Sequence, residues 1–262
     1  MGMQSKPKLG QHWLKDQTVL KTMVETAAVN QDSTVLEIGP GQGALTDKLA
    51  AAGASVVAVE LDPEIANKLA KSFKESERIQ IVHGDILRYD VSHLPQGYTV
   101  AANIPYYLTA PILKQLVTSD NPPKLMVLLV QAEVAQRLAA RPGNLSTLGV
   151  AIQFFGNVEI IKAVLPSAFE PQPKVHSAII AIRRKPDTNT AKVERIMKLV
   201  RHGFANKRKT LINSLSAGLK MEKPLVTTRL KQAGLPPNVR AQDLTLESWE
   251  KLYNLFEQEK HG

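Results

Sequence analysis

The chain has 262 residues, of which 44% are hydrophobic and 22% are charged, a composition typical of a soluble globular protein. It contains no cysteine, which excludes a disulfide framework, a thiolate metal site and a cysteine nucleophile. The longest apolar run, at 125–130, is far too short to cross a bilayer, and no apolar signal segment precedes it. We therefore expect a cytoplasmic protein that does not associate with a membrane.

The positive charge is concentrated in one segment. Residues 183–223 contain twelve Lys or Arg residues and three acidic ones, a net charge of +9 that equals the net charge of the whole chain. Such a local excess is typical of a surface that binds a polyanion, although a solvated basic face without a partner has the same composition.

From residue 34 the chain alternates short apolar runs with stretches of helical period, the pattern of repeated βαβ units. The stretches of helical period predict helices at 43–53, 62–73, 109–119 and 132–140. The apolar runs predict strands at 34–39, 55–61, 78–85, 98–103, 124–131, 158–165 and 177–184.

Strands this uniformly apolar are covered on both faces, so the sequence predicts an α/β, Rossmann-like fold with a mostly parallel seven-stranded sheet and helices on either side. We expect the last two strands to pair antiparallel at the edge of the sheet. A polar break at 185–191 marks a boundary, which gives one domain over 1–185 and a small basic helical domain over 186–262.

A glycine-rich loop follows the first predicted strand, in the motif EIGPGQGALT. Gly39 and Gly41 lie where open α/β sheets bind nucleotides, and Glu60 ends the next strand, where a carboxylate can accept hydrogen bonds from ribose hydroxyls. With Ala44, these glycines fit the dinucleotide fingerprint as well as they fit the loop of an S-adenosylmethionine enzyme. A structural glycine turn is a third interpretation.

Two later residues favour S-adenosylmethionine. Asp85 ends the third strand, where its carboxylate can accept from the amino group of a cofactor adenine, or alternatively cap a turn. Asn103 ends the fourth strand, on the same edge of the sheet. Two carboxylates would repel a pyrophosphate, whereas they tolerate a cationic sulfonium. An NAD-dependent oxidoreductase stays an alternative, but it leaves Asp85 and Asn103 unexplained.

The motif NIPYY at 103–107 indicates chemistry on an adenine amine. This amine is a poor nucleophile because its lone pair is conjugated into the ring, and two acceptors on its hydrogens would free that lone pair. The side chain of Asn103 and the backbone carbonyl of Ile104 are the predicted acceptors, with Pro105 fixing the backbone. Tyr106 is predicted to stack on the base, and Tyr107 to pack in the core. No metal ion is expected.

Seven motifs occur in an order that resembles the ribosomal RNA adenine dimethyltransferase family, most closely its small-subunit (16S) branch, over about residues 6–255. The resemblance implies a methyltransferase fold with S-adenosylmethionine as donor. It also implies dimethylation of two adjacent adenosines near the 3′ end of small-subunit RNA, by a monomer that acts on the assembling 30S particle. The motifs are KPKLGQHWL, EIGPGQGALT, VELDP, HGDIL, NIPYY, LPSAFEPQPKVHSAII and FANKRKTLINSL.

The resemblance also assigns roles to individual positions. Many family members have Asn-Phe where this chain has His12 and Trp13, so the resemblance carries over a backbone contact at position 12 and not the side-chain roles. Phe204 matches a family aromatic that can stack on the other face of the target base, although its periodicity alone favours the core. The implied cofactor-binding residues are Gln11, His12, Leu14, Gly39, Gly41, Glu60, Asp85, Ile86 and Asn103.

The basic segment is predicted to contact RNA phosphates through Arg201, Lys207, Arg208 and Lys209. Phosphate contacts supply affinity and orientation, so selection of the adenosine is assigned to the pocket and to the shape of the RNA. One alternative is a large-subunit adenine methylase of the macrolide-resistance type, which shares the glycine loop and an Asn-x-Pro-Tyr motif. Another is a non-catalytic ribosome assembly factor, against which the intact Asp85 and Asn103 argue.

Overall fold

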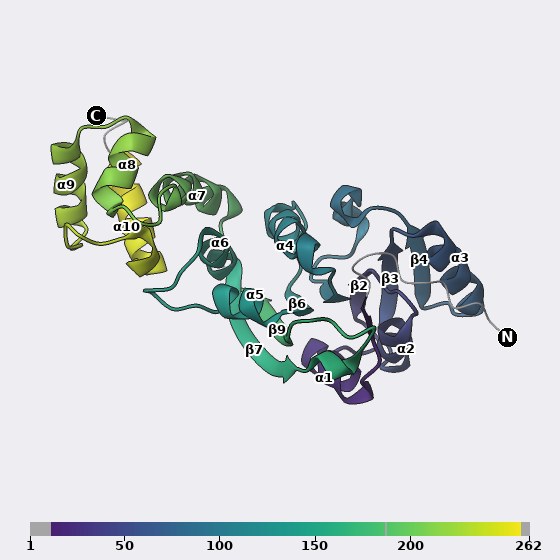
Figure 1. Cartoon of the computed structure of the whole chain (residues 1–262). Helices are drawn as coiled ribbons and strands as arrows, with labels where there is room; N and C mark the ends of the chain where they lie inside the picture. The colour runs from purple at the N-terminus through teal and green to yellow at the C-terminus, as the bar shows by residue number, and fades with distance from the viewer. Residues whose placement is uncertain (1–11, 187, 258–262) are drawn as a thin grey trace. The chain divides into compact units, whose positions relative to one another are not determined.

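The computed structural model describes residues 12–186 and 188–257 and divides the chain into two compact units (Figure 1). The first contains the sheet and the second is helical. Their ranges are Met1–Ala135 with Asn157–Arg184 for the first unit, and Gln136–Gly156 with Lys185–Gly262 for the second.

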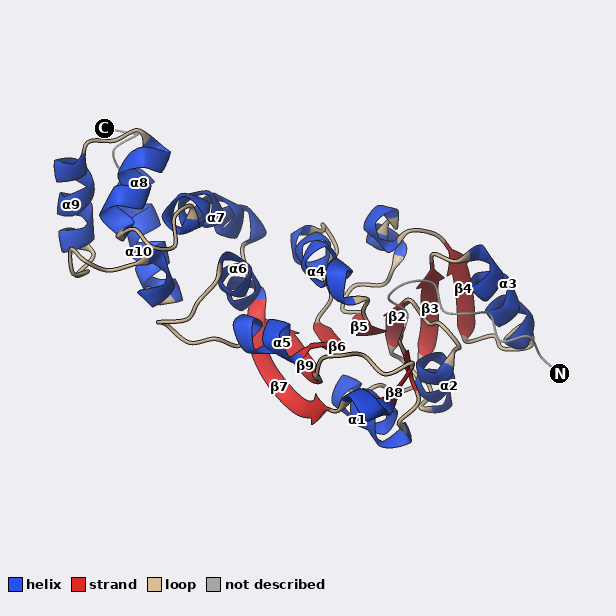
Figure 2. Ribbon diagram, viewed as in Figure 1, coloured by secondary structure: helices blue, strands red, loops and turns tan. Residues whose placement is uncertain are grey.

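The first unit contains a seven-stranded sheet in the order β4-β3-β2-β5-β6-β9-β7 (Figure 2). Neighbouring strands from β4 to β6 are parallel, and β9 runs antiparallel to β6. The predicted fold class is therefore confirmed. The last two strands are neighbours as expected, but only β7 is an edge strand, because β9 lies between β6 and β7. The strands are β2 (Thr34–Ile38), β3 (Ser55–Glu60), β4 (Ile79–His83), β5 (Thr99–Asn103), β6 (Leu125–Gln131), β7 (Gly156–Val164) and β9 (Ser177–Arg184).

Alternate strand residues point to opposite faces, and helices cover both. Val35, Ala101 and Val127 join the core beneath α1 and α2, whereas α4 lies on the other side of the sheet (Figure 2). Asp62 caps α3, its carboxylate accepting from the backbone of Glu64, as the Asp-Pro start of this helix predicts. The helices are α1 (Gln17–Ala27), α2 (Ala44–Ala51), α3 (Pro63–Ser72), α4 (Thr109–Thr118) and α5 (Ala132–Leu138).

A short two-stranded piece holds residues 12–15, here called the arm. β1 (Trp13–Leu14) pairs antiparallel with β8 (Phe169–Glu170), the strand that precedes β9. Lys15 forms an ion pair with Glu170, and its backbone N–H donates to the carbonyl of Ala168 over 2.9 Å. The arm is thereby fixed to a segment more than 150 residues away in sequence.

The second unit is a helical bundle around Trp249, which is fully buried. Trp249, Leu252 and Phe256 lie in its core, as their helical spacing predicts. It also includes α6, because Val150 of that helix is buried in the same core, whereas the sequence analysis placed this segment with the sheet. The helices are α6 (Thr147–Phe155), α7 (Thr190–Phe204), α8 (Leu211–Leu219), α9 (Lys223–Gln232) and α10 (Leu246–Glu257).

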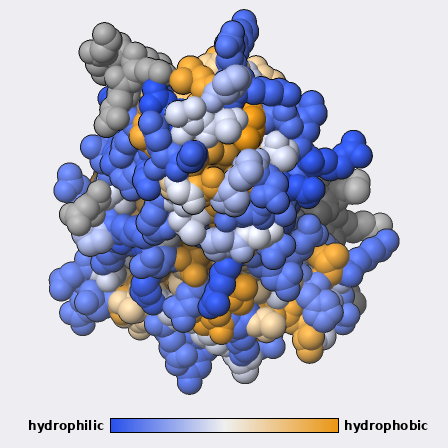
Figure 3. Space-filling model, turned by 90° about the vertical axis from the view of Figure 1, so that its left-hand side faces the viewer, coloured by the Kyte–Doolittle hydropathy of each residue, from blue (hydrophilic) through white to orange (hydrophobic). Residues whose placement is uncertain are grey.

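No helix in the described part of the chain is long and apolar enough to cross a membrane. The side of the molecule drawn in Figure 3 is largely hydrophilic, with hydrophobic residues in small patches.

Candidate active site

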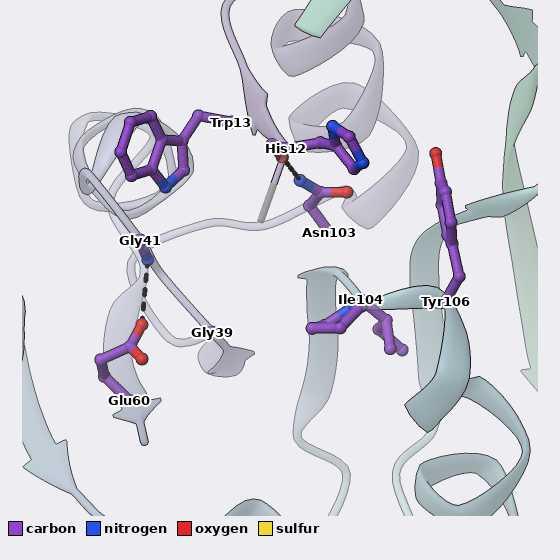
Figure 4. Close-up of a pocket in the computed structure, with 9 residues that line it drawn as sticks. His12, Trp13, Gly39, Gly41, Glu60, Asn103, Ile104 and Tyr106 are labelled. Atoms are coloured by element: carbon purple, nitrogen blue, oxygen red, sulfur yellow. Dashed lines mark hydrogen bonds between the residues drawn. The ribbon is translucent and has the colours of Figure 1, made fainter. Parts of the chain in front are cut away.

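The carboxyl ends of the parallel strands form a rim with a pocket of about 100 Å³ (Figure 4). Four parts of the chain meet there because β2, β3 and β5 end on the same edge of the sheet and β1 contributes to the same pocket. The lining residues are His12 and Trp13 of the arm, Gly39 and Gly41 of the loop, Glu60 of β3, and Asn103, Ile104, Pro105 and Tyr106 at the end of β5.

The glycine loop lets the backbone reach this pocket. Gly39 and Gly41 have φ values of +64° and +58°, in the left-handed region that favours glycine. A β-carbon on Gly39 would meet nothing within 4 Å and would project into open space. On Gly41 it would lie 3.3 Å from Cδ1 of Trp13, so the indole covers the loop at this point. Trp13 is a lining residue that the sequence analysis did not assign.

Glu60 is buried and held by two backbone donors. Its carboxylate accepts from the N–H of Gly41 over 3.3 Å and from the N–H of Asp62 over 2.9 Å (Figure 4). Each carboxylate oxygen has more than one acceptor site, so acceptor capacity is left over for hydroxyl groups of a bound molecule. The glycine loop and the end of β3 therefore fix the carboxylate at the edge of the pocket.

The side chain of Asn103 has a fixed orientation. Its Nδ2 donates to the backbone carbonyl of His12 over 3.1 Å, and in Figure 4 its carbonyl oxygen points toward the side on which Tyr106 lies. No described residue donates a hydrogen bond to that oxygen. The backbone of His12 thus holds the amide so that the carbonyl oxygen of Asn103 faces the pocket.

A second pocket, of about 290 Å³, shares Gly39, Glu60 and Pro105 with the first. It is lined by Asp85 and Ile86, so the structure brings both into the same cleft. One oxygen of Asp85 accepts from the backbone of Leu87 over 2.9 Å and caps a 3₁₀ turn. Asp85 is thus a cap and a pocket carboxylate at once.

Tyr107 was expected to pack in the core, and this expectation is wrong. Its side chain is 72% exposed and lines the second pocket. The reason is the 3₁₀ turn Tyr106–Leu108, which directs adjacent side chains to different sides: Tyr106 toward the first pocket and Tyr107 toward the second.

Glu37 is a further acidic residue beside the loop that the sequence analysis did not single out. It is 2% exposed and, with Leu14 and Asn103, lines a small cavity of about 50 Å³. Burial raises the pKa of Glu37 to about 8, and the charge of Glu60 adds to the shift. An acid inside an apolar strand is the sequence signal that could have identified it.

Glu37 is expected to make stability depend on pH. Because its pKa is about 8 in the folded chain and near 4.5 otherwise, the folded state binds more protons between these values. The free energy of unfolding should therefore fall as pH rises across this window, by at most about 1.4 kcal/mol per pH unit. Glu37→Gln, which resembles the protonated form, should flatten the fall in a urea titration series from pH 5 to 8. A Gln variant with the same pH slope as the natural chain would contradict this.

The charge of the cleft decides between the two cofactor classes. Three carboxylates, Glu60, Asp62 and Asp85, line it, and no Lys or Arg is among the described residues that line either pocket. A pyrophosphate would find no cation there, whereas a sulfonium cofactor with ribose and adenine groups fits the acceptors present. The described residues also hold no group of three or more His, Asp or Glu side chains that could bind a metal ion.

A family model for ribosomal RNA adenine dimethylases matches residues 2–258. The chain belongs to the ribosomal RNA adenine dimethylase family. Methyltransferases that use S-adenosylmethionine as donor make up this family, in agreement with the cleft.

Relatives in the family include proteins named ribosomal RNA small subunit methyltransferase A. The one from Dehalococcoides mccartyi is 37% identical over 255 residues, covering 95% of this chain and 88% of the relative. The one from Rippkaea orientalis is 40% identical over 269 residues, covering 97% and 98%.

Two solved structures are similar across nearly the whole chain. A dimethyladenosine transferase from Plasmodium falciparum has a TM-score of 0.83 at 25% identity and covers 95% of this chain and 98% of its own. The 23S rRNA methyltransferase ErmE has a TM-score of 0.76 at 27% identity and covers 94% and 100%. The small-subunit relatives are therefore more similar in sequence than this large-subunit enzyme.

Some predicted residues lie outside these pockets. Gln11 is outside the described residues. Phe204 belongs to the second unit, where its ring packs 6.1 Å from that of Trp249, centroid to centroid. The four basic residues are exposed at the end of α7 and in the loop after it, and none forms an ion pair with a described carboxylate; they are Arg201, Lys207, Arg208 and Lys209.

Proposed function

We propose that this chain dimethylates adenines of small-subunit ribosomal RNA, at two adjacent adenosines near the 3′ end, with S-adenosylmethionine as donor. The observation that carries the proposal is the side-chain oxygen of Asn103, which accepts from no described residue and lies in one pocket with the glycine loop and Glu60. Family membership and relatives named for the small subunit support the choice of substrate.

The cofactor would lie along the two connected pockets. Glu60 accepts from its ribose hydroxyls, Asp85 accepts from its adenine amine beside the apolar side chain of Ile86, and Gly39 and Gly41 leave room for the chain between them. Bound in this way, S-adenosylmethionine supplies a methyl group on a positively charged sulfur, which keeps the electron pair of the broken bond and becomes a neutral thioether. His12 completes the side of the cleft formed by the arm, and Leu14 lines the small neighbouring cavity that also contains Glu37.

The residues at the end of β5 bind and orient the target adenine. The oxygen of Asn103 accepts one hydrogen of its amine, and the backbone carbonyl of Ile104 accepts the other, which localises the lone pair on nitrogen. Pro105 fixes this backbone, and the ring of Tyr106 stacks on the base. Holding both reactants in one small pocket supplies much of the acceleration, up to about 7–11 kcal/mol in favourable intramolecular systems.

The second unit supplies affinity for RNA. Arg201, Lys207, Arg208 and Lys209, which are exposed and form no ion pair with a described carboxylate, contact phosphates. Phe204 is the family aromatic predicted to stack on the base. The partner is the assembling 30S particle, and the chain acts as a cytoplasmic monomer. Sedimentation of the chain with and without small subunits tests this assignment: comigration with unmethylated particles and a monomer mass when free are expected.

Glu60 gives a prediction that concerns the cofactor alone. Glu60→Gln should weaken binding of S-adenosylmethionine by roughly 10- to 100-fold, because hydrogen bonds to a charged acceptor contribute about 1.5–3 kcal/mol. Isothermal titration calorimetry measures it, with Glu64→Gln, an exposed change on α3, as the control. Equal affinities for both variants would remove Glu60 from the cofactor site.

A further inference from the structure

One side chain of α4 holds the turn that follows Asp85. This 3₁₀ turn, Ile86–Arg88, begins directly after Asp85, and Ile86 lines the second pocket together with that carboxylate. Nε2 of Gln115 donates to the backbone carbonyl of Ile86 over 2.9 Å and, more weakly, to that of Tyr89 over 3.5 Å. A single amide therefore ties the first residue of the turn, and the residue just after it, to α4.

The other hydrogen bonds of the turn are internal to it. The carbonyl of Ile86 accepts from the N–H of Tyr89 over 3.2 Å, and the carboxylate of Asp85 accepts from the N–H of Leu87 over 2.9 Å. These bonds fix the shape of the turn, whereas the bonds from Gln115 fix it relative to another element. Because Asp85 caps the turn, a shift of the turn would carry its carboxylate along.

The helix that carries Gln115 begins at the pocket. Leu108, the residue just before α4, lines the second pocket with Asp85. Leu108, Ile112 and Gln115 are spaced by four and three residues, so they share one face of the helix, and Ile112 is fully buried on it. The face of α4 that begins in the pocket therefore also carries the amide that holds the turn.

The surroundings of Gln115 do not favour an amide for stability alone. Its Oε1 is buried and accepts from no described residue. A buried acceptor without a donor costs folding free energy, so an apolar side chain of similar shape would stabilise the fold nearly as well. The reversed amide would place an oxygen against two carbonyls, so the orientation of Nε2 is set by the turn. The amide therefore fits a positioning role better than a purely structural one.

We propose that Gln115 is a positioning residue of the cofactor site, which holds the turn after Asp85 so that its carboxylate meets the amine of the cofactor adenine. The inference rests on the proposed function, which assigns that amine to Asp85, and deepens it. Gln115 is not among the described residues that line the two pockets of the cleft, so it acts through Asp85 and Ile86 and not by touching the ligand.

Asn121 provides a matched comparison. Its Nδ2 donates to the backbone carbonyls of Val91 and Leu94 over 3.0 and 2.8 Å, in the same segment between β4 and β5. Like Gln115 it is an amide that holds two carbonyls, but neither of them belongs to a residue that lines the second pocket. General loosening of the segment should thus appear in variants of both residues, and displacement of Asp85 in variants of Gln115 alone.

The test measures the preference for adenine over hypoxanthine. Isothermal titration calorimetry compares S-adenosylhomocysteine with S-inosylhomocysteine, whose base carries a carbonyl in place of the amine. The natural chain should bind the adenosyl ligand roughly 10- to 100-fold more tightly, because hydrogen bonds to a charged acceptor are strong. Gln115→Met removes both donors at nearly constant volume and should reduce this preference by roughly 2- to 30-fold, the range for residues that modulate a site from outside it. Asn121→Leu should keep the preference of the natural chain.

A second variant without donors, Gln115→Leu, should reduce the preference in the same way, and thermal unfolding shows which variants are folded. An unchanged preference in a folded Gln115 variant would overturn the inference. An equal reduction in Asn121→Leu would also overturn it, because loosening of the whole segment would then explain both results. A natural chain without any preference would remove Asp85 from the adenine site, and the inference with it. A natural chain that binds neither ligand would instead refute the proposed function.

Discussion

Replacing Asn103 with Ala should lower kcat for methyl transfer to small subunits by about 10²- to 10³-fold. This is the usual effect on kcat of removing one preorganised hydrogen-bonding group from an active site. The acceptor for the adenine amine disappears, and so does the bond that ties the arm to the end of β5. Cofactor affinity should fall much less than kcat, because Glu60 and Asp85 are untouched. The measurement is single-turnover transfer of labelled methyl.

The fold should survive this change. One hydrogen bond to a backbone carbonyl contributes about 0.5–1.5 kcal/mol, so thermal unfolding should shift only slightly. Asn67→Ala, an exposed change on α3, is the matched control and should keep full activity. Full turnover by the Asn103 variant would contradict the role given to the amide.

Neutralising Lys207, Arg208 and Lys209 together by Gln should flatten the salt dependence of RNA binding. Each phosphate contact contributes about 0.7–0.9 to the slope of log K against log salt, so three contacts should remove about 2–2.7. These side chains are exposed and make no ion pair with a described carboxylate, so no ion pair between described residues is lost with them. Binding to small subunits between 50 and 200 mM salt measures it.

A control variant that loses the same charge elsewhere shows whether the salt dependence comes from these three residues or from the total charge of the chain. Gln at Lys68, Lys71 and Lys74 removes the same three positive charges from exposed positions in or just after α3. This control should leave the slope nearly unchanged. Equal slopes for the two triple variants would exclude the loop after α7 from the RNA interface.

The parts of the fold that could be predicted depend on local pattern and chain order. Alternating apolar runs and helical stretches gave the parallel strands, and the carboxyl ends of parallel strands share one edge. For this reason Glu60, Asp85 and Asn103 could be placed on one rim without knowing any contact. The cap at Asp62 followed from two adjacent residues.

The parts that could not be predicted depend on contacts between distant segments. The residues around Trp13 give no indication that it pairs with Glu170. In the folded chain this pairing lies next to the hydrogen bond between the carbonyl of His12 and Asn103. The exposure of Tyr107 follows from a 3₁₀ turn that apolar periodicity does not reveal. Likewise, the sequence around Val150 predicts that it is buried but does not indicate in which of the two cores. In the folded chain it lies in the core of the second unit.

The most direct test of the account offers labelled S-adenosylmethionine to the purified chain with unmethylated small subunits and, in parallel, with large subunits. We predict label only in small-subunit RNA, recovered as dimethylated adenosine at two neighbouring positions. Label in large-subunit RNA, or on a nucleoside other than adenosine, would contradict the account, as would the absence of transfer to either particle.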